Sequence, residues 1–430
     1  MIDIEVDVAL TLPGLISAEV QDHLILHDPS KHRTHVLNPS AALVWASIAG
    51  HNSVRATIER VAASLDGGTD ADTLSREVVE ALTRFVDEGV VHLTRDGTGA
   101  PLPGWPTPAE QAGVADGIAD QGRHSSERSQ PEWPPLPSGS KWCLGPGPRQ
   151  LLGTTVELLT TDPDLAEAFS ELLGSFPRAT ESDHHVAVVT SDELDVDGYR
   201  STVTTDGQVV ARTVETDLAL RHALSESNRL AIDNTPDRLV LHAGAVETAG
   251  HVVVIIGESG HGKSTLVAAL VRSGMAYVTD EAVALDPVSG RVDVYPKWID
   301  LDEPSRALLG LEQVDVSAAA AGLKYPLPPN RLGPVSAGGR AGLLVLLGSP
   351  DTATTSSSEP TGGYPMAVRR LLAILDNTFS TTTALPGALE HLAELSASMP
   401  VLDLDRADLA TMVATVTGAL RAGMRGGDGG

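Results

Sequence analysis

The hydrophobic pattern divides the chain into folded stretches and one long stretch without periodicity. Apolar residues recur at strand or helix spacing through residues 1–95, fade over 96–140, and recur again from 141 onward. The unpatterned stretch is rich in Pro, Gly and Ser, a composition typical of linkers. We therefore expect a small domain over 1–95, a linker over 96–140, an α+β lead-in subdomain over 141–237 and an α/β domain over 238–425.

The first region has the pattern of a small winged-helix-like domain. Two apolar segments within 23–37 are separated by the turn sequence Asp-Pro-Ser-Lys, which predicts a β-hairpin. Asn38-Pro39 and Ser53 are helix-start signals, and apolar residues at helical spacing over 70–88 predict a third helix. A strand over 90–93 completes the predicted unit.

The second region alternates strands with helices, which favours an α/β architecture. We expect strands over 154–160, 185–190, 201–204, 208–214, 238–246, 251–256, 275–279 and 341–347, and helices over 164–173, 217–231, 265–272, 367–376 and 388–396.

A complete phosphate-binding loop lies between the strand at 251–256 and the helix at 265–272. Its glycines let the backbone aim successive N–H groups at phosphate oxygens, where the helix dipole adds positive potential. Lys263 supplies a mobile charge, and the Ser264 hydroxyl is suited to a magnesium ion. The sequence therefore predicts ATP as a ligand, with contacts from Gly257, Glu258, Ser259, Gly260, His261, Gly262, Lys263, Ser264 and Thr265.

Two adjacent acids, Asp280 and Glu281, follow the short apolar strand at 275–279. We expect that strand to neighbour the strand of the phosphate loop, so that both acids emerge beside the nucleotide. One carboxylate can hold Mg²⁺ while the other accepts a proton from an attacking hydroxyl. This arrangement favours phosphoryl transfer over nucleotide binding alone.

Composition narrows the environment and the partners. A net charge of −27 argues against a nucleic-acid partner, and the absence of an apolar run or signal segment favours a cytoplasmic protein without a membrane span. Cys143 is the only cysteine, which excludes an internal disulfide. Only five of the 30 basic residues are lysines, so Lys297 and Lys324 are candidates for phosphate or substrate contact.

The segments HAGAV at 242–246, GESGHGKST at 257–265 and YVTDEAVALD at 277–286 resemble the core of HPr serine kinase/phosphorylase and its actinobacterial relatives. The resemblance implies that His242 lies near the reacting phosphate, that Lys263 and Ser264 bind phosphates and Mg²⁺, that Asp280 is the general base and that Glu281 helps to hold the metal. Glu281 stands where the bifunctional enzymes have a second aspartate, and their Arg-Gly-Leu-Gly-type signature is absent. Both departures argue against phosphorylase activity and HPr recognition.

The segment THVLNPSAALVW at 34–45, with FVDEGVV at 85–91, resembles PqqD-type domains. These are the recognition elements of ribosomal peptide-modification systems, and they capture a leader peptide by β-augmentation. The resemblance implies a leader-binding groove formed by residues 23–37 and 70–88. A DNA-binding winged helix is the alternative, but the region lacks a basic recognition face.

Together the two resemblances predict an ATP-dependent kinase that phosphorylates a Ser or Thr hydroxyl of a precursor peptide, lasso peptides being one candidate class. Two alternatives stay open: a nucleotide-gated peptide chaperone without kinase activity, and a regulatory kinase that acts on an HPr-like carrier protein. The sequence does not identify an oligomer interface, although related kinases often form oligomers.

Overall fold

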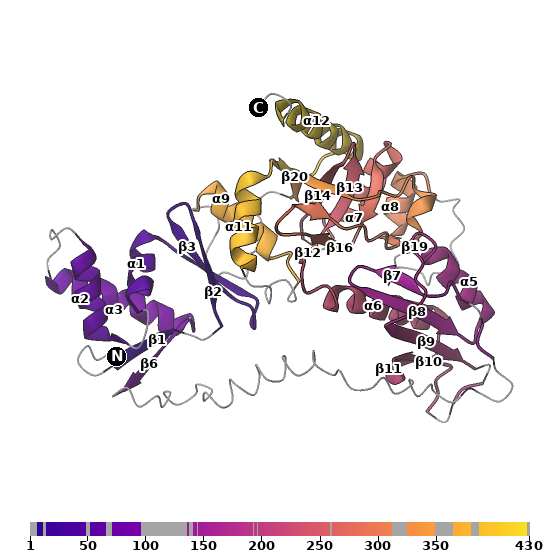
Figure 1. Cartoon of the computed structure of the whole chain (residues 1–430), viewed down its shortest axis with the longest axis horizontal. Coiled ribbons are helices and arrows are strands. Elements are labelled where there is room, and N and C mark those ends of the chain that lie inside the picture. The colour runs from indigo at the N-terminus through magenta and orange to yellow at the C-terminus, as the bar shows by residue number, and fades with distance from the viewer. Residues whose placement is uncertain are drawn as a thin grey trace. The chain divides into compact units, whose positions relative to one another are not determined.

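The computed structural model forms two compact units, Met1–Ser129 and Gln130–Gly430, each of which is described by itself (Figure 1). The predicted linker lies almost entirely outside the described residues. The structure describes residues 7–11, 14–48, 52–65, 71–95, 136, 141–143, 145–191, 193–195, 197–258, 260–311, 325–348, 364–379 and 387–427.

The first unit contains the predicted hairpin, helices and returning strand. Strand β3 is the middle strand of an antiparallel sheet between β2 and β4, and β1 lies between β5 and β6 in a second sheet. Strands β1 and β2 were not predicted, although apolar and acidic residues alternate over 2–8. The elements are β1 Asp7–Thr11, β2 Ile16–Val20, β3 His23–Asp28, β4 Arg33–Leu37, α1 Pro39–Ile48, β5 Asn52–Ser53, α2 Val54–Ser64, α3 Ala71–Asp87 and β6 Val91–Arg95.

Local signals explain why these helices form. The Ser53 hydroxyl accepts a hydrogen bond of 3.1 Å from the Ala56 N–H, as expected of an N-cap. Helix α3 places Leu74, Val78, Leu82 and Phe85 on one buried face, at the spacing the sequence predicted. This face is the centre of the hydrophobic core of the unit.

The second unit begins with a five-stranded sheet of order β11-β10-β9-β8-β7. Helices α5 and α6 contribute Phe169, Leu220 and Leu224 to the core beside this sheet. The predicted strands and helices of this part are all present. Their bounds are β7 Arg149–Leu151, β8 Thr154–Thr160, α5 Pro163–Leu172, β9 His184–Thr190, β10 Ser201–Thr205, β11 Gln208–Thr213 and α6 Thr216–Asp233.

A larger sheet follows the order β12-β16-β17-β20-β14-β13-β15, and β21 pairs with β20. Helices α7 and α12 both pack in the core that contains β14 and β20. Its elements are β12 Leu239–His242, β13 Gly244–Thr248, β14 His251–Ile256, α7 Lys263–Arg272, β15 Ala276–Thr279, β16 Ala282–Leu285, β17 Arg291–Val292, β20 Gly339–Leu347, β21 Val401–Leu404 and α12 Leu409–Gly427. The remaining elements are β18 Ile299–Leu301, α8 Glu303–Leu308, β19 Tyr325–Leu327, η2 Pro329–Arg331, α9 Met366–Leu375 and α11 Ala388–Ser398.

The expectation that the 275–279 strand neighbours the phosphate-loop strand was wrong. Strand β13 lies between β14 and β15 and is antiparallel to both. The turn at 249–250 returns the chain directly from β13 to β14, so this hairpin occupies the position expected for β15. Because β14 and β15 are both antiparallel to β13, they still run in the same direction, and β15 leads toward the same end of the sheet.

The predicted strand at 238–246 is interrupted at Ala243, and so is its partner. Residues 239–242 pair with 282–285, and residues 245–247 pair with 276–279, in one antiparallel direction. Between the two paired halves lie Ala243 and Gly244 on one strand, opposite Asp280 and Glu281 on the other. We call this arrangement the interrupted ladder.

Each half of the interrupted ladder belongs to a different hydrophobic core. Val246 and Tyr277 pack in the core beside α7, whereas Val240 and Ala282 pack in the core beside α5 and α6. The predicted lead-in subdomain therefore shares a core with β12 and β16, and the boundary at 237/238 is not a break in packing. The acid pair lies at the junction of the two cores.

Helix α12 was not predicted as an element. Its residues Met412, Val416 and Leu420 are buried at helical spacing in the core beside α7. This spacing is visible in the sequence and could have been used to predict the helix. No helix within the described ranges is both long and apolar enough to span a membrane.

We predict that Gly244→Ala destabilises the second unit by about 1–3 kcal/mol through overpacking. A Cβ at Gly244 would lie 2.5 Å from Cγ2 of Val267 on α7, and the branched Val side chain is stiff. Thermal unfolding of the full chain measures the effect. Gly418→Ala on the exposed face of α12 is the matched control, because a Cβ there meets nothing within 4 Å. An unchanged unfolding temperature for Gly244→Ala would contradict the close packing of α7 on β13.

Candidate functional site

The predicted phosphate loop connects β14 to α7 through two glycines in left-handed conformation. Gly260 has a φ of 81° and Gly262 a φ of 89°, values that disfavour other residues. Gly257 is needed for a different reason, since a Cβ there would lie 2.7 Å from the Leu347 carbonyl oxygen. Helix α7 then begins at Lys263, with its first N–H groups facing the loop.

Lys263 is held inside the loop in this structure. Its side chain is buried, and Nζ donates hydrogen bonds of 2.6 Å to the Gly257 carbonyl and 3.4 Å to the Glu258 carbonyl. Phosphate oxygens would be stronger acceptors than these neutral carbonyls. The lysine is therefore placed where a bound anion could take over its hydrogen bonds.

A cavity of about 710 Å³ opens beside the loop and the interrupted ladder. Gly260, Gly262, Lys263, Ser264 and Thr265 line it from the loop and α7. The other predicted site residues that line it are His242, Asp280, Glu281 and Lys297. The structure thus brings most of the predicted catalytic and phosphate-binding residues to one cavity.

Asp280 is buried in the cavity wall, and hydrogen bonds within the described ranges do not satisfy both of its carboxyl oxygens. Only 6% of the residue is exposed, and Oδ1 has no hydrogen-bond partner among the described residues. Burial raises the pKa of Asp280 to about 7, although the charge of Lys297 and a hydrogen bond from the Ser264 hydroxyl act in the opposite direction. A carboxyl group with a pKa near neutrality is suited to proton exchange.

Glu281, the next residue, has the opposite environment. Its Oε1 lies 3.4 Å from Nδ1 of His242, and its Oε2 lies 3.3 Å from Nζ of Lys297. Burial acts to raise the pKa of Glu281, but the His242 hydrogen bond and the Lys297 charge outweigh it and lower the pKa to about 2. Glu281 is therefore a permanent anion, whereas Asp280 can exchange a proton.

Lys297 is buried and makes two ion pairs. Nζ lies 3.3 Å from Glu281 and 3.1 Å from Oδ2 of Asp300, and it stands 5.1 Å from the ring centroid of Trp298. Burial acts to lower the pKa of Lys297, but Asp300 and Glu281 raise it above its usual value. The partners of the Lys297 ammonium in this structure are therefore two carboxylates.

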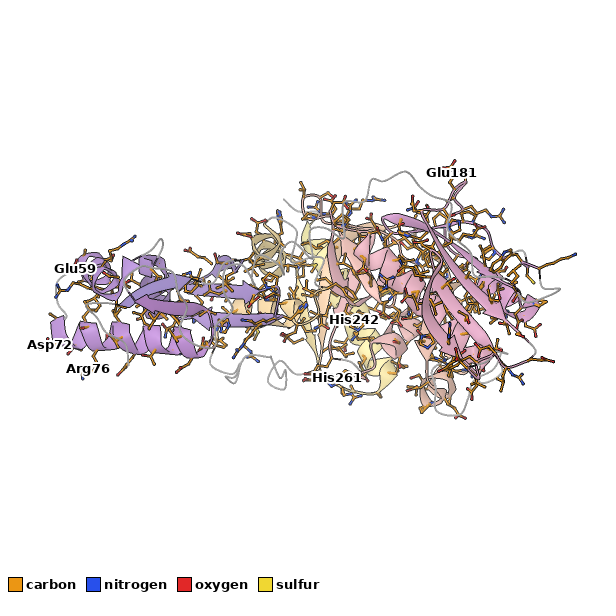
Figure 2. The ribbon with its side chains drawn as sticks, turned by 90° about the horizontal axis from the view of Figure 1, so that it is seen from below. Glu59, Asp72, Arg76, Glu181, His242 and His261 are labelled. Atoms are coloured by element: carbon orange, nitrogen blue, oxygen red, sulfur yellow. The ribbon has the colours of Figure 1, made fainter. Side chains whose placement is uncertain are left out.

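Five predicted contacts, including Gly257, are not placed in the cavity. Glu258 and His261 are 3.4 Å apart and form a pair with each other, and neither is among the residues that line the cavity; Figure 2 labels His261 and His242 in the second unit. Ser259 and Lys324 lie outside the described residues, so their assignments stay predictions.

Sequence reasoning missed the wall that α6 contributes. Arg221, Leu224, Ser225 and Asn228 line the cavity at helical spacing. Arg406, which follows β21, and Asp300, Asp302 and Ser305 near α8 also line it. Only the apolar and acidic alternation at 299–302 gave a local signal for any of these residues.

The predicted magnesium ligands Ser264 and Glu281 both line the cavity, and their role toward Mg²⁺ stays a prediction. The Ser264 hydroxyl bonds to Asp280, and both oxygens of Glu281 are occupied by His242 and Lys297. Within the described part of the chain, no group of three or more His, Cys, Asp or Glu side chains could hold a metal ion by itself.

Residues 23–91 match the family model for coenzyme PQQ synthesis protein D, PqqD. The first unit therefore contains a PqqD domain, which confirms that resemblance. The match covers a minority of the chain and does not reach the second unit, whose resemblance to HPr kinases stays a prediction. No curated protein matches the chain.

We predict that Asp280→Asn stabilises the folded chain increasingly as the pH rises from about 4.5 to 8. The pKa of the Asp280 carboxyl is raised from 3.8 to about 7, so its contribution to stability is complete below about pH 4 and is lost as the pH rises through 7. Asparagine does not titrate, so the difference in free energy of unfolding should grow by at least about 1 kcal/mol. Urea unfolding at several pH values measures it. A difference that stays constant or shrinks would contradict the burial of an ionisable Asp280.

Proposed function

We propose that the chain is an ATP-dependent kinase that phosphorylates a Ser or Thr hydroxyl of a ribosomally synthesised precursor peptide held by its PqqD domain. The observation that supports phosphoryl transfer is the position of Asp280 in the cavity that Lys263 and Ser264 line: its carboxyl is buried, and Oδ1 has no hydrogen-bond partner among the residues the structure describes. A site that only binds a nucleotide needs no buried carboxyl of this kind. Transfer of phosphate to a hydroxyl needs a group that accepts the hydroxyl proton.

In this proposal the loop N–H groups and Lys263 bind the phosphates of ATP. The acceptor hydroxyl oxygen bonds to the γ-phosphorus while the bond from that phosphorus to the bridging oxygen of ADP breaks. The hydroxyl proton passes to Asp280, whose pKa of about 7 allows it to be ionised before the reaction. His242 lies beside the acids and would contact the transferred group.

The PqqD domain would supply the acceptor by β-augmentation. The outer edge of β4 has no strand partner among the described residues, and the end of α3 lies against this strand, with His35 Nδ1 3.0 Å from Glu88 Oε2. Half-buried Val79 and Val86 stand at i and i+7 on α3, on a face beside its core residues. A leader strand paired with β4 would find apolar contacts on that face.

Tethering links the two halves of the proposal. A peptide whose leader is bound to the first unit is presented to the second at an effective concentration of roughly a millimolar. The cavity then does not need to bind the acceptor segment tightly. This explains why a peptide-binding domain and a nucleotide cavity would occur in one chain.

We predict that Asp280→Asn lowers phosphoryl transfer at saturating ATP by about 10²–10⁴-fold, because it removes the proton acceptor. The assay uses labelled ATP, Mg²⁺ and a precursor peptide that binds the PqqD domain. ADP binding should change by less than about threefold. Glu181→Gln, an exposed carboxylate of the second unit labelled in Figure 2, is the matched control and should retain full transfer. Nucleotide binding without any labelled peptide would instead support the nucleotide-gated chaperone.

We predict that Val79→Glu weakens leader binding about tenfold or more, through lost apolar contact and a buried charge. Fluorescence polarisation of a labelled leader peptide measures the dissociation constant. Glu59→Ala, at an exposed position on α2 labelled in Figure 2, should leave it unchanged. Equal affinity for wild type and Val79→Glu would argue against the α3 groove. Weaker leader binding with undiminished transfer would support a regulatory kinase with a different acceptor.

A further inference from the structure

His242 has a defined orientation at the edge of the cavity. Its backbone N–H donates a 2.6 Å hydrogen bond to the Asn377 carbonyl, and its ring meets Phe379 edge-on, with centroids 5.9 Å apart. These contacts fix the backbone and one side of the ring, which stays 38% exposed. These contacts do not determine which of the two ring nitrogens carries the proton.

Glu281 determines which nitrogen carries the proton. Its Oε1 faces Nδ1 at 3.4 Å, and a carboxylate next to one ring nitrogen favours the tautomer with hydrogen on that nitrogen. Nε2 is then the unprotonated nitrogen. The same logic applies where a carboxylate orients a histidine that acts through its other nitrogen.

Glu281 is itself held by Lys297. The ammonium joins Oε2 of Glu281 to Oδ2 of Asp300, and the residue is 4% exposed. The Tyr277 hydroxyl donates a 2.7 Å hydrogen bond to the Lys297 carbonyl, which fixes its backbone. The four side chains thus form a continuous series of contacts: Asp300, Lys297, Glu281 and His242.

The charges along this series explain why a lysine is buried here. Without Lys297, the carboxylates of Asp280, Glu281 and Asp300 would face the cavity together and repel a nucleotide. A phosphate could reach the Lys297 ammonium only in competition with two ion pairs. The sequence had suggested that Lys297 contacts phosphate or substrate. Its position in the structure is better suited to holding Glu281.

We propose that Lys297 is a positioning residue that, with Asp300, fixes Glu281 so that His242 presents unprotonated Nε2 to the cavity. The catalytic consequence rests on the proposed kinase function, but the orientation of His242 does not. Lys297 would then affect the turnover rate through His242 and would affect nucleotide affinity little.

The tautomer can be measured directly in the full-length protein without nucleotide or peptide. Selective ¹⁵N-histidine labelling with long-range ¹H–¹⁵N correlation at about pH 8.5, where imidazoles are ordinarily neutral, distinguishes the two forms. His242→Gln assigns the resonance. We expect the Nδ1–H form to predominate in wild type, the Nε2–H form to predominate in Glu281→Gln and Lys297→Met, and Lys297→Arg to retain the wild-type form.

Enzyme kinetics and ADP binding provide the second test. Lys297→Met should lower kcat at least about tenfold and change the ADP dissociation constant less than about threefold, with rescue of kcat by Lys297→Arg. If Lys297→Met does not fold, Glu281→Gln and Lys297→Arg decide the question through the tautomer alone. An unchanged tautomer in Glu281→Gln would overturn the proposal, as would a loss of ADP affinity in Lys297→Met that exceeds the loss of kcat. A correct tautomer pattern in a protein without transfer activity would refute only the proposed function.

Discussion

The interrupted ladder is the constraint on which the rest of the candidate site depends. Its two halves pair on both sides of Asp280 and Glu281, and each half is anchored in a separate hydrophobic core. The backbone of the acid pair is therefore fixed at both ends and cannot relax without disrupting a core. Such rigidity allows a carboxyl group to remain buried without a full set of hydrogen bonds.

The ladder also explains why adjacent carboxyl groups behave differently. Both residues lie in the bend between β15 and β16, where Asp280 bonds to Ser264 while Glu281 contacts His242 and Lys297. Burial dominates the environment of Asp280, whereas at Glu281 the His242 hydrogen bond and the charge of Lys297 outweigh burial. These different surroundings move the two pKa values to opposite sides of the normal range for acids.

The sequence predicted most features that arise from neighbouring residues. The turn between β14 and α7, the hairpin at β3 and β4 and the helix α3 were all predicted because Gly, Ser and apolar spacing act locally. The position of β13 between β14 and β15 was not predicted, because the pairing of β13 with β15 joins residues that are distant in the sequence. The cavity wall on α6 was missed for a similar reason, since Arg221 and Asn228 belong to no motif. The scarcity of lysine drew attention to Lys297, but the partners of its ammonium required the fold.

Phosphates bound by the loop and the buried carboxyl of Asp280 should meet in one cavity. A crystal structure with a non-hydrolysable ATP analogue tests this most directly. We expect the phosphates to contact the N–H groups of residues 260–265, Lys263 to be released from the Gly257 carbonyl, and the Asp280 carboxyl to face the terminal phosphate. A nucleotide bound elsewhere, or an Asp280 side chain turned away from that phosphate, would contradict it.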